Sequence, residues 1–349
     1  MIIRLLFATL LCTPLFFFVS CNSVFPQEEK WSIKDYPNFR IKFVDAKTGF
    51  ILGPRILRTT DGGRSWSVIE NAHEAGAIIA RDGPETRKFA VDFVDQNSGW
   101  RLSPRDMNAV DYTEDGGRSW SLPIKFGDKV YQRSLIFLNR ETGWVCGESS
   151  VLKTTDGGKH WSEEVSLRGL RLQYPFFLDQ SHGWIANEFG DLARTVDGGK
   201  HWTVEKSLPT KVTTVFFTTD MVGWLVGEDG IVARTEDGGQ QWLRESVPVP
   251  YDATRKEHVK LLDIYFWTKE VGWITGYNGL LLRTVDGGRT WTNIETPTKA
   301  PLSSIRFVDD QHGWAVGGFW VPAIPVAGPS NLVIETIDGG KTWRIKNFS

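Results

Sequence analysis

Residues 212–246 read VTTVFFTTDMVGWLVGEDGIVARTEDGGQQWLRES, and this stretch contains the unit from which most of the chain is built. Short runs rich in Val, Phe, Trp and Thr alternate with Gly and Asp, which is the pattern of β-strands separated by turns. We expect four consecutive strands here, at 212–218, 222–228, 231–236 and 240–246. Strands that follow one another so closely are expected to pair as one antiparallel sheet.

The turn before the last run belongs to a motif, Thr-x-Asp-Gly-Gly-x-x-Trp, that occurs seven times at intervals of 40 to 54 residues. The Asp accepts N–H bonds from the residues after it, and Gly-Gly permits positive φ, so the motif predicts a hairpin. The Trp is expected to fold over the turn and bury its ring. We therefore interpret the motif as structural at Asp61, Trp66, Asp115, Trp120, Asp156, Trp161, Asp197, Trp202, Asp237, Trp242, Asp286, Trp291, Asp338 and Trp343.

A second motif, Gly followed by an aromatic residue, precedes each copy, and the two motifs together use 13 of the 16 Trp. No segment after residue 30 shows the 3.6-residue periodicity of a helix. Four antiparallel strands repeated every 40–50 residues or so are typical of a β-propeller. The sequence thus predicts an all-β fold: a seven-bladed β-propeller of four-stranded antiparallel blades over residues 39–346, with an Asp-box hairpin in every blade.

The seven motifs are similar to the Asp-box, or BNR, repeat. Residues 261–291, LLDIYFWTKEVGWITGYNGLLLRTVDGGRTW, resemble the photosystem II stability/assembly factor family of seven-bladed propellers, and the likeness extends over nearly the whole chain after the N-terminal segment. The resemblance implies a non-catalytic propeller that binds a protein partner as an assembly or stability factor. It also implies a basic surface patch, and the family includes exported lipoproteins. Sialidases, xyloglucanases and sorting receptors carry the same box, so the repeat is more specific for fold than for function.

The N-terminal segment has the pattern of an export signal. Residues 2–20 form an apolar run with one early Arg, and Phe18-Val19-Ser20-Cys21 resembles a bacterial lipobox, in which Cys21 becomes the lipidated N-terminus. We predict a lipoprotein-type signal peptide at 1–20, export, and membrane contact through the lipid in the periplasm, at the cell surface or in the thylakoid lumen. A plain signal peptide and an uncleaved membrane anchor are the alternatives.

Residues 21–38 are predicted to be the lipidated N-terminus and a tether. Residues 29–33 (EKWSI) resemble a fourth strand of a blade and are a possible closing strand for the ring. Residues 341–346 supply the same strand at the other end of the chain, so the sequence leaves the mode of closure open.

Composition narrows the functional classes. The chain has 40 Lys and Arg against 42 Asp and Glu, and this balance gives no support for nucleic-acid binding. Three Cys exclude a disulfide scaffold, and Cys146 lies on a predicted strand as a buried thiol. The defined positions of the motif include a single carboxylate and lack the spaced acidic ligands of a calcium loop, so calcium is not expected. A two-His metal site at His160 and His201 is a minor alternative to two exposed hairpin residues. We expect a monomer without metal or cofactor.

Strand direction sorts the connections onto two faces. If the strands of a blade are named A to D, the A–B and C–D turns share one face, which we call the box face because all Asp boxes are C–D turns. The long connections fall on the opposite, insertion face: 71–87 and 247–260 between blades, and 103–111 and 317–331 between strands B and C. Loops held by a rigid scaffold carry function, so we expect a binding site on the insertion face. The alternative is that these loops vary in length without functional consequence.

Basic residues recur where the A strands begin on the insertion face. The predicted partner-binding residues are Arg87, Arg133, Arg171, Lys211 and Lys260. Fixed positive charge around the ring axis would attract an acidic loop, a carboxylate or a phosphate, although solvated strand ends are the alternative. We expect a protein partner that is membrane-associated or has an acidic segment. Phe319 and Trp320 begin an apolar loop that suits a protein partner or a membrane surface, or that covers the ring axis as a plug.

The main functional alternative is an exo- or endo-acting glycoside hydrolase of the sialidase type, or a polysaccharide-binding module. Sialidases use a Tyr nucleophile paired with Glu, and Tyr131, Tyr251 and Tyr277 could reach the insertion face or the ring axis without an obvious Glu partner. Residues 39–42 (FRIK) resemble a sialidase motif but lack its Pro. No G-x-S-x-G, P-loop or H-E-x-x-H motif occurs, so we expect no enzyme activity.

Overall fold

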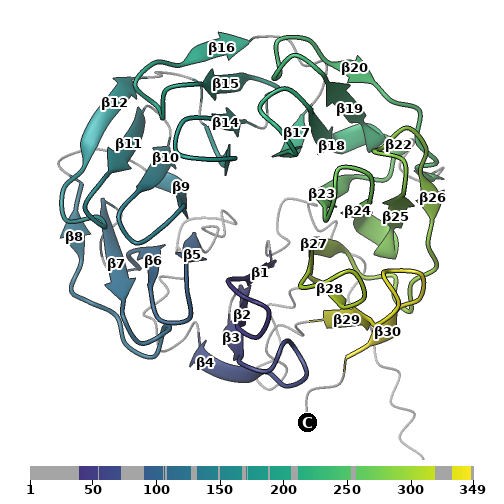
Figure 1. Ribbon diagram of the computed structural model, residues 1–349, viewed down its shortest axis with the longest axis horizontal. Helices are drawn as coiled ribbons and strands as arrows, with labels where there is room; N and C mark the ends of the chain where they lie inside the picture. The colour runs from purple at the N-terminus through teal and green to yellow at the C-terminus, as the bar shows by residue number, and fades with distance from the viewer. Residues whose placement is uncertain are drawn as a thin grey trace, which may run out of the picture. The chain divides into compact units, whose positions relative to one another are not determined.

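The computed structural model describes residues 39–53, 55–71, 90–104, 106, 108–126, 132–147, 150–166, 170, 172–187, 189–205, 211–252, 257–318 and 332–346. These residues form seven four-stranded sheets arranged in a ring (Figure 1). In every sheet the strands pair in chain order and antiparallel, so each blade is a simple meander. The predicted all-β seven-bladed propeller is confirmed.

The first four blades occupy the first part of the ring. Blade 1 contains β1 (Arg40–Phe43), β2 (Gly49–Leu52), β3 (Arg55–Thr59) and β4 (Ser67–Asn71). Blade 2 contains β5 (Val91–Phe93), β6 (Gly99–Leu102), β7 (Ala109–Thr113) and β8 (Ile124–Lys125). Blade 3 contains β9 (Gln132–Phe137), β10 (Gly143–Gly147), β11 (Ser150–Thr154) and β12 (Ser162–Ser166). Blade 4 contains β13 (Tyr174–Phe177), β14 (Gly183–Ala186), β15 (Leu192–Thr195) and β16 (Thr203–Glu205).

Three blades complete the ring. Blade 5 contains β17 (Val212–Phe217), β18 (Gly223–Gly227), β19 (Val232–Thr235) and β20 (Leu243–Arg244). Blade 6 contains β23 (Leu261–Phe266), β24 (Gly272–Gly276), β25 (Leu281–Thr284) and β26 (Thr292–Asn293). Blade 7 contains β27 (Leu302–Phe307), β28 (Gly313–Gly317), β29 (Leu332–Thr336) and β30 (Arg344–Ile345). A small hairpin of β21 (Tyr251–Asp252) and β22 (Glu257–His258) lies between blades 5 and 6.

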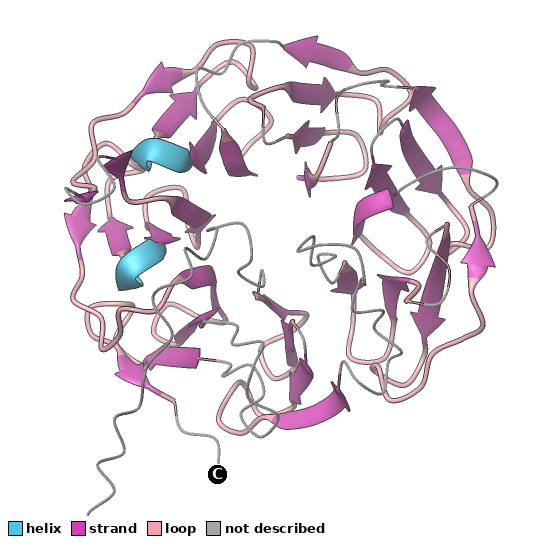
Figure 2. Cartoon of the chain, turned by 180° about the vertical axis from the view of Figure 1, so that it is seen from behind, coloured by secondary structure: helices cyan, strands magenta, loops and turns pink. Residues whose placement is uncertain are grey.

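Helical structure is minor in the described residues. It consists of two short 3-10 turns, η2 (Glu228–Gly230) and η3 (Tyr277–Gly279), both between strands B and C (Figure 2). No helix in these ranges is long and apolar enough to cross a membrane. The A strand of each blade lies nearest the ring axis and the D strand lies at the outer edge (Figure 1).

The meander confirms the predicted division into two faces. The Asp boxes all connect strands C and D, as at residues 236–242 between β19 and β20, and they share a face with the A–B turns. The B–C and D–A connections, including the hairpin of β21 and β22, leave from the opposite face. The long connections therefore leave from the insertion face, as predicted from the sequence.

One cross-strand row recurs in every blade and explains the Gly-aromatic motif. In blade 5 this row is Phe217, Gly223 and Thr235, which pair side by side on β17, β18 and β19. The Phe ring lies over the Gly, because a Cβ built at Gly223 would come within 2.4 Å of that ring. Only glycine leaves this space, and the same row recurs at residues 43/49/59, 93/99/113, 137/143/154, 177/183/195, 266/272/284 and 307/313/336.

The same aromatic contact joins each pair of neighbouring blades, and it is stacked at every junction except that of blades 7 and 1, where it is tilted. The strand-B aromatic of each blade lies on the row Phe of the following blade, as Trp184 does on Phe217 at 3.6 Å between ring centroids. Equivalent pairs join the other blades, and the last, Trp314 on Phe43 at 4.9 Å, joins blade 7 to blade 1. Strand D of blade 7 comes from the C-terminal end of the ring, at Arg344–Ile345, whereas the possible closing strand at 29–33 lies outside the described residues.

Candidate functional site

The Asp-box carboxylates accept hydrogen bonds from residues of their own turns. In the blade 1 box, Thr59 Oγ1 donates to Asp61 Oδ1 at 2.8 Å, and the backbone N–H of Ser65 donates to the same oxygen at 2.9 Å. Ser65 Oγ donates to the other oxygen at 2.6 Å. Partial burial raises the pKa of Asp61, but these hydrogen bonds outweigh it and hold the pKa at about 2. The other six boxes repeat the Thr and backbone bonds, so each of these Asp side chains is held within its own turn.

The box Trp closes the turn as expected. Trp161 Nε1 donates to the carbonyl of Gly158 at 2.9 Å, and its ring meets Phe137 of the same blade edge-on at 6.0 Å. The edge-on contact with the row Phe recurs in all seven blades at 5.9–6.1 Å. These Trp side chains therefore join the turn to the blade core and are not free for a ligand.

The metal alternatives find no support in the described part of the chain. His160 and His201 are exposed, and each ring Nδ1 bonds the Asp of its own box, Asp156 and Asp197, at 2.6 Å. No group of three His, Cys, Asp or Glu side chains in these ranges could hold a metal ion. Cys146 on β10 is fully buried, and burial raises the pKa of its thiol well above its usual value.

Two of the predicted partner-binding residues, Lys211 and Lys260, come together at the insertion face. Lys211 directly precedes β17 and Lys260 directly precedes β23, and both ammonium groups pair with Glu228 of η2, at 3.3 and 3.0 Å. Partial burial raises the pKa of Glu228, but Lys260 and Lys211 outweigh it and hold the pKa below its usual value. Glu228 thus pairs with both cations, and the exposed carboxylate of Asp229 lies beside it in the same turn.

The structure describes the backbone of one further predicted residue and leaves the others outside its described ranges. Arg133 belongs to β9 by its backbone, and nothing is described of its side chain. The remaining predicted site residues lie outside the described residues: Arg87, Arg171, Phe319, Trp320 and Cys21.

A cluster of charges near the ring axis was missed by the sequence reasoning. Lys42 Nζ on β1 pairs with Asp92 on β5 at 2.5 Å, and Arg306 Nη1 on β27 pairs with Asp263 on β23 at 2.7 Å. Both carboxylates also accept backbone N–H bonds from the A strand of the next blade, at Phe137 and Ile305. The sequence carried a signal, because each of these inner strands contains a charged residue within an otherwise uncharged run of strand-forming residues or beside one.

Arg40 begins β1 and lies among these charges. Enclosure by the surrounding protein lowers the pKa of Arg40, and Arg306 adds to this effect while Asp92 and Asp263 oppose it. The side chain nevertheless keeps substantial contact with solvent. A group in an open ring can be surrounded by protein atoms without being covered by them. Arg40 therefore adds an accessible guanidinium to the start of an inner strand.

The described residues that a glycoside hydrolase could use are not placed for catalysis. Asp92 and Asp263 are buried and held by cations and backbone N–H groups, so neither is placed as a free acid or base. Tyr251 on the hairpin packs edge-on against His258 at 5.3 Å, and Tyr277 in η3 is buried. Tyr131 lies outside the described residues. Within the described ranges, Tyr251 has no carboxylate partner of the kind a sialidase nucleophile needs.

Comparisons with known proteins agree with this geometry. The family described as "Photosynthesis system II assembly factor YCF48" matches residues 83–172, 164–244 and 206–306. No curated protein sequence matches the chain significantly. Among solved structures, YCF48 bound to a D1 peptide is 20% identical, with a TM-score of 0.62 over 82% of this chain and 90% of that one.

Two further structures show how widely the fold is shared. YCF48 from Cyanidioschyzon merolae is 17% identical, with a TM-score of 0.63 over 88% of this chain and 97% of that one. A GH74 xyloglucanase from Xanthomonas campestris is 13% identical, with a TM-score of 0.61 over 90% of this chain but only 55% of its own. At such identities these likenesses concern the fold alone.

Proposed function

Because this chain belongs to the photosynthesis system II assembly factor YCF48 family, we propose that it is a non-catalytic propeller that binds a protein partner. The observation that carries the proposal is the distribution of charge near the ring axis. Asp92, Asp263 and Glu228 each form ion pairs. Arg40, in contrast, remains open to solvent, and Lys211 and Lys260 stand together at the starts of two inner strands. Such a site suits binding of an acidic segment. Among the described residues near the ring axis, Asp92 and Asp263 are both held by cations and are not placed for the acid and base roles of glycoside hydrolysis.

The proposed binding surface is the insertion-face rim formed by Arg40, Lys211 and Lys260, where inner strands begin. Arg87, Arg133 and Arg171 extend the proposal around the ring, and Phe319 and Trp320 add an apolar contact. A solved YCF48 holds a D1 peptide, which supports the idea that a propeller of this family can receive a peptide segment of its partner. We propose a single copy of this chain as the binding unit.

The proposed setting is the outer side of a membrane. The apolar run at 2–20 followed by Cys21 supports export and lipid attachment, with the ring held near the membrane by residues 21–38. A lipid anchor would place the ring close to a membrane-associated partner and so raise the local concentration of each for the other.

The rim can be tested by removing its charge. We predict that Arg40→Gln, Lys211→Gln and Lys260→Gln together reduce capture of the partner roughly tenfold, because fixed positive charge guides and holds an acidic segment. Capture is measured by crosslinking and affinity purification of the tagged chain from its own cells, with quantitative mass spectrometry. Thermal unfolding should change little, because Lys211 is more than half exposed and surface pairs contribute little.

A matched control removes the same charge from the other face. Lys159, Lys200 and Lys341 occupy Asp-box turns, so the triple Gln variant there changes net charge equally on the box face. Equal partner recovery from the rim variant and the native chain, or equal loss from both variants, would reject the rim as the binding surface.

A glycoside hydrolase remains the second candidate because the xyloglucanase shares the fold over 90% of this chain. It predicts turnover of aryl-glycoside, sialoside or xyloglucan substrates, and a polysaccharide-binding module predicts retarded migration in glycan-containing gels. Measurable hydrolysis that survives purification to homogeneity would replace the proposal of a non-catalytic protein.

A further inference from the structure

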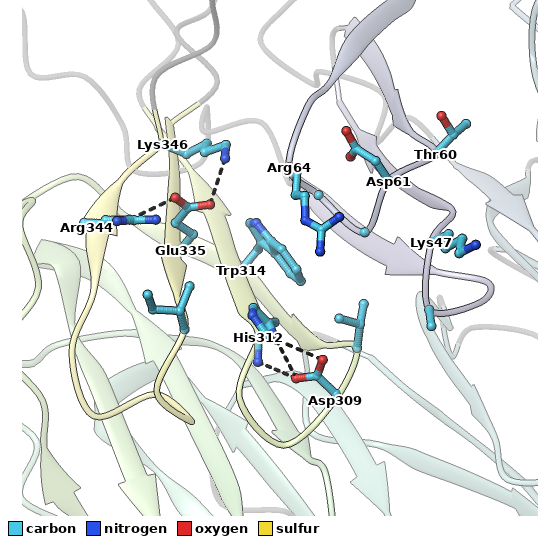
Figure 3. Close-up of a pocket in the computed structure, with 15 residues that line it drawn as sticks. Lys47, Thr60, Asp61, Arg64, Asp309, His312, Trp314, Glu335, Arg344 and Lys346 are labelled. Carbon is cyan, nitrogen blue, oxygen red and sulfur yellow. Dashed lines mark hydrogen bonds and ion pairs between the residues drawn. The ribbon is translucent and has the colours of Figure 1, made fainter.

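A cavity of about 640 Å³ opens on the box face where blade 7 meets blade 1 (Figure 3). Blade 1 contributes Lys47, Asp61 and Arg64 to its wall, and blade 7 contributes His312, Trp314 and Glu335. Trp314 lies between Arg64 and Glu335 in the view of Figure 3. The cavity lies on the face opposite the rim, so a ligand bound in it would not occupy the surface proposed for the protein partner.

A break in the repeat explains why this junction is open. The residue before the box Thr is basic in five blades: Arg58, Lys153, Arg194, Arg234 and Arg283. Lys153 Nζ and Arg283 Nε reach the next blade and donate to the first Gly carbonyl of its box, at 2.8 and 3.2 Å.

Blade 7 has Glu335 at this position. Its side chain is buried and accepts hydrogen bonds from Arg344 Nε and Lys346 Nζ of its own blade, both at 3.0 Å. An acid cannot donate to the carbonyl of Gly62 in blade 1, and Glu335 turns toward its own blade. The space that a long basic side chain spans elsewhere is thus left as a cavity.

The acidic groups in the wall are already satisfied. Asp61 is held by its own box, and Asp309 bonds His312 Nδ1 at 2.9 Å together with two backbone N–H groups of its turn. Glu335 is held by two cations. None of the three carboxylates is therefore available to attract a cation into the cavity.

The unused groups in the wall are donors and cations. Arg118 and Arg289, at the box position equivalent to Arg64, donate to the carbonyl of their own box Asp at 2.9 and 3.2 Å. Arg64 makes no such bond, and neither Arg64 nor Lys47 has a side-chain hydrogen bond or ion pair within the described residues. Trp314 forms part of the wall and is 3% exposed, and its buried Nε1–H has no hydrogen-bond partner within the described residues, as is also true of Trp224 and Trp273 at two other junctions.

We propose that this cavity binds a carboxylate group. The planar guanidinium of Arg64 matches a carboxylate geometrically, and Lys47 adds positive charge to the same wall. The carboxylate belongs either to an acidic peptide or to a small organic acid, which share this chemistry.

The NMR signal of the Trp314 indole N–H can report whether the cavity is occupied, because Trp314 forms part of its wall. The full chain labelled with ¹⁵N at Trp is titrated with glutarate, with hexaglutamate and with inorganic phosphate, and the Trp314 signal is assigned through Trp314→Phe. We expect a saturable shift of this signal, and we expect Arg64→Gln to weaken binding roughly tenfold. Arg289→Gln, which changes the equivalent position of blade 6, is the matched control and should bind as the native chain does.

Each outcome decides the proposal. Saturation by glutarate supports a small acid, and saturation by hexaglutamate alone supports a peptide. The proposal is overturned if neither carboxylate probe shifts the Trp314 signal, if phosphate shifts it and the carboxylates do not, or if Arg289→Gln weakens binding as much as Arg64→Gln.

Discussion

At the scale of single residues, the Thr of each box is as important as the Asp that gives the box its name. Thr59 is buried, and its hydroxyl donates to Asp61 while accepting the N–H of Gly63 at 2.9 Å and that of Asp61 at 3.4 Å. The hydroxyl therefore satisfies a buried backbone donor in addition to orienting the carboxylate. A side chain of the same shape without the hydroxyl would leave that donor unpaired.

We predict that Thr59→Val lowers the free energy of unfolding by about 1–3 kcal/mol, the usual cost of an unsatisfied buried polar group. The measurement is urea unfolding followed by circular dichroism. The neighbouring Thr60 is exposed and makes no hydrogen bond within the described residues, so Thr60→Val should change stability little. Similar losses from the two variants would contradict the role assigned to the Thr59 hydroxyl.

Residue-level reasoning from the sequence also had a clear limit. It counted Lys211 and Lys260 as rim cations but missed that Glu228 neutralises part of their charge. Glu228 belongs to the B–C turn of blade 5, which lies on the same face as the starts of β17 and β23. A pairing that depends on two blades being adjacent in the ring has no signature in the local sequence.

At the scale of elements, the junction between blades is the repeating unit of stability. Trp184 on β14 is fully buried, stacks on Phe217 and donates Nε1–H to the carbonyl of Gly238 at 2.8 Å. Blade 1 has Phe50 at the equivalent position, and this ring stacks on Phe93 at 3.8 Å without the donor. The stacking surface and the hydrogen bond can therefore be separated by substitution.

We predict that Trp184→Ala destabilises the chain by about 3–5 kcal/mol through the cavity it leaves, whereas Trp184→Phe costs about 1 kcal/mol for the lost hydrogen bond. Chemical unfolding of both variants provides the measurement. Trp267 is 38% exposed, and Trp267→Ala serves as the control with little expected effect. A Phe variant as unstable as the Ala variant would show that the hydrogen bond, and not the stack, holds this junction.

The sequence predicted the elements well because each blade is local. The recurring Phe, Gly, Thr and Asp positions determine the strands, register and turns within about 50 residues. The axial cluster of Lys42, Asp92 and Arg306 was not predicted, because its partners come from different blades. Glu335 stands out in the sequence because the residue before the box Thr is basic in five of the blades. The sequence could not show that this junction is open, because that follows from the contacts of Glu335 with Arg344 and Lys346 of its own blade.

At the scale of the whole molecule, the seven boxes couple stability to pH. Partial burial opposes ionisation of Asp61, Asp115 and Asp338, but hydrogen bonds lower the pKa of each from 3.8 to about 2. A carboxyl whose pKa is lower in the folded state stabilises the fold above its unfolded pKa. That contribution is lost as the pH falls from about 4 toward 2.

We predict that the free energy of unfolding is steady between about pH 5 and 6 and declines steeply between about pH 4 and 2. In Asp286, hydrogen bonds led by Thr290 hold the pKa at about 2, so Asp286→Asn should reduce the steepness of this decline. Urea midpoints measured across this range at constant ionic strength test both statements. Identical slopes for variant and native chain would mean that other carboxyl groups cause the acid sensitivity.

The simple meander of each blade has a consequence for how the molecule is made. Since every sheet is completed by consecutive residues, a blade can fold as soon as its own segment has emerged, whether from a ribosome or through a translocation pore. The junction of blade 7 with blade 1, where Trp314 meets Phe43 from 271 positions away in the chain, must wait for the last segment. Folding would then proceed blade by blade. If blade 7 failed to close onto blade 1, all the blades would be formed, but the ring would stay open and the apolar faces of these two blades would remain exposed.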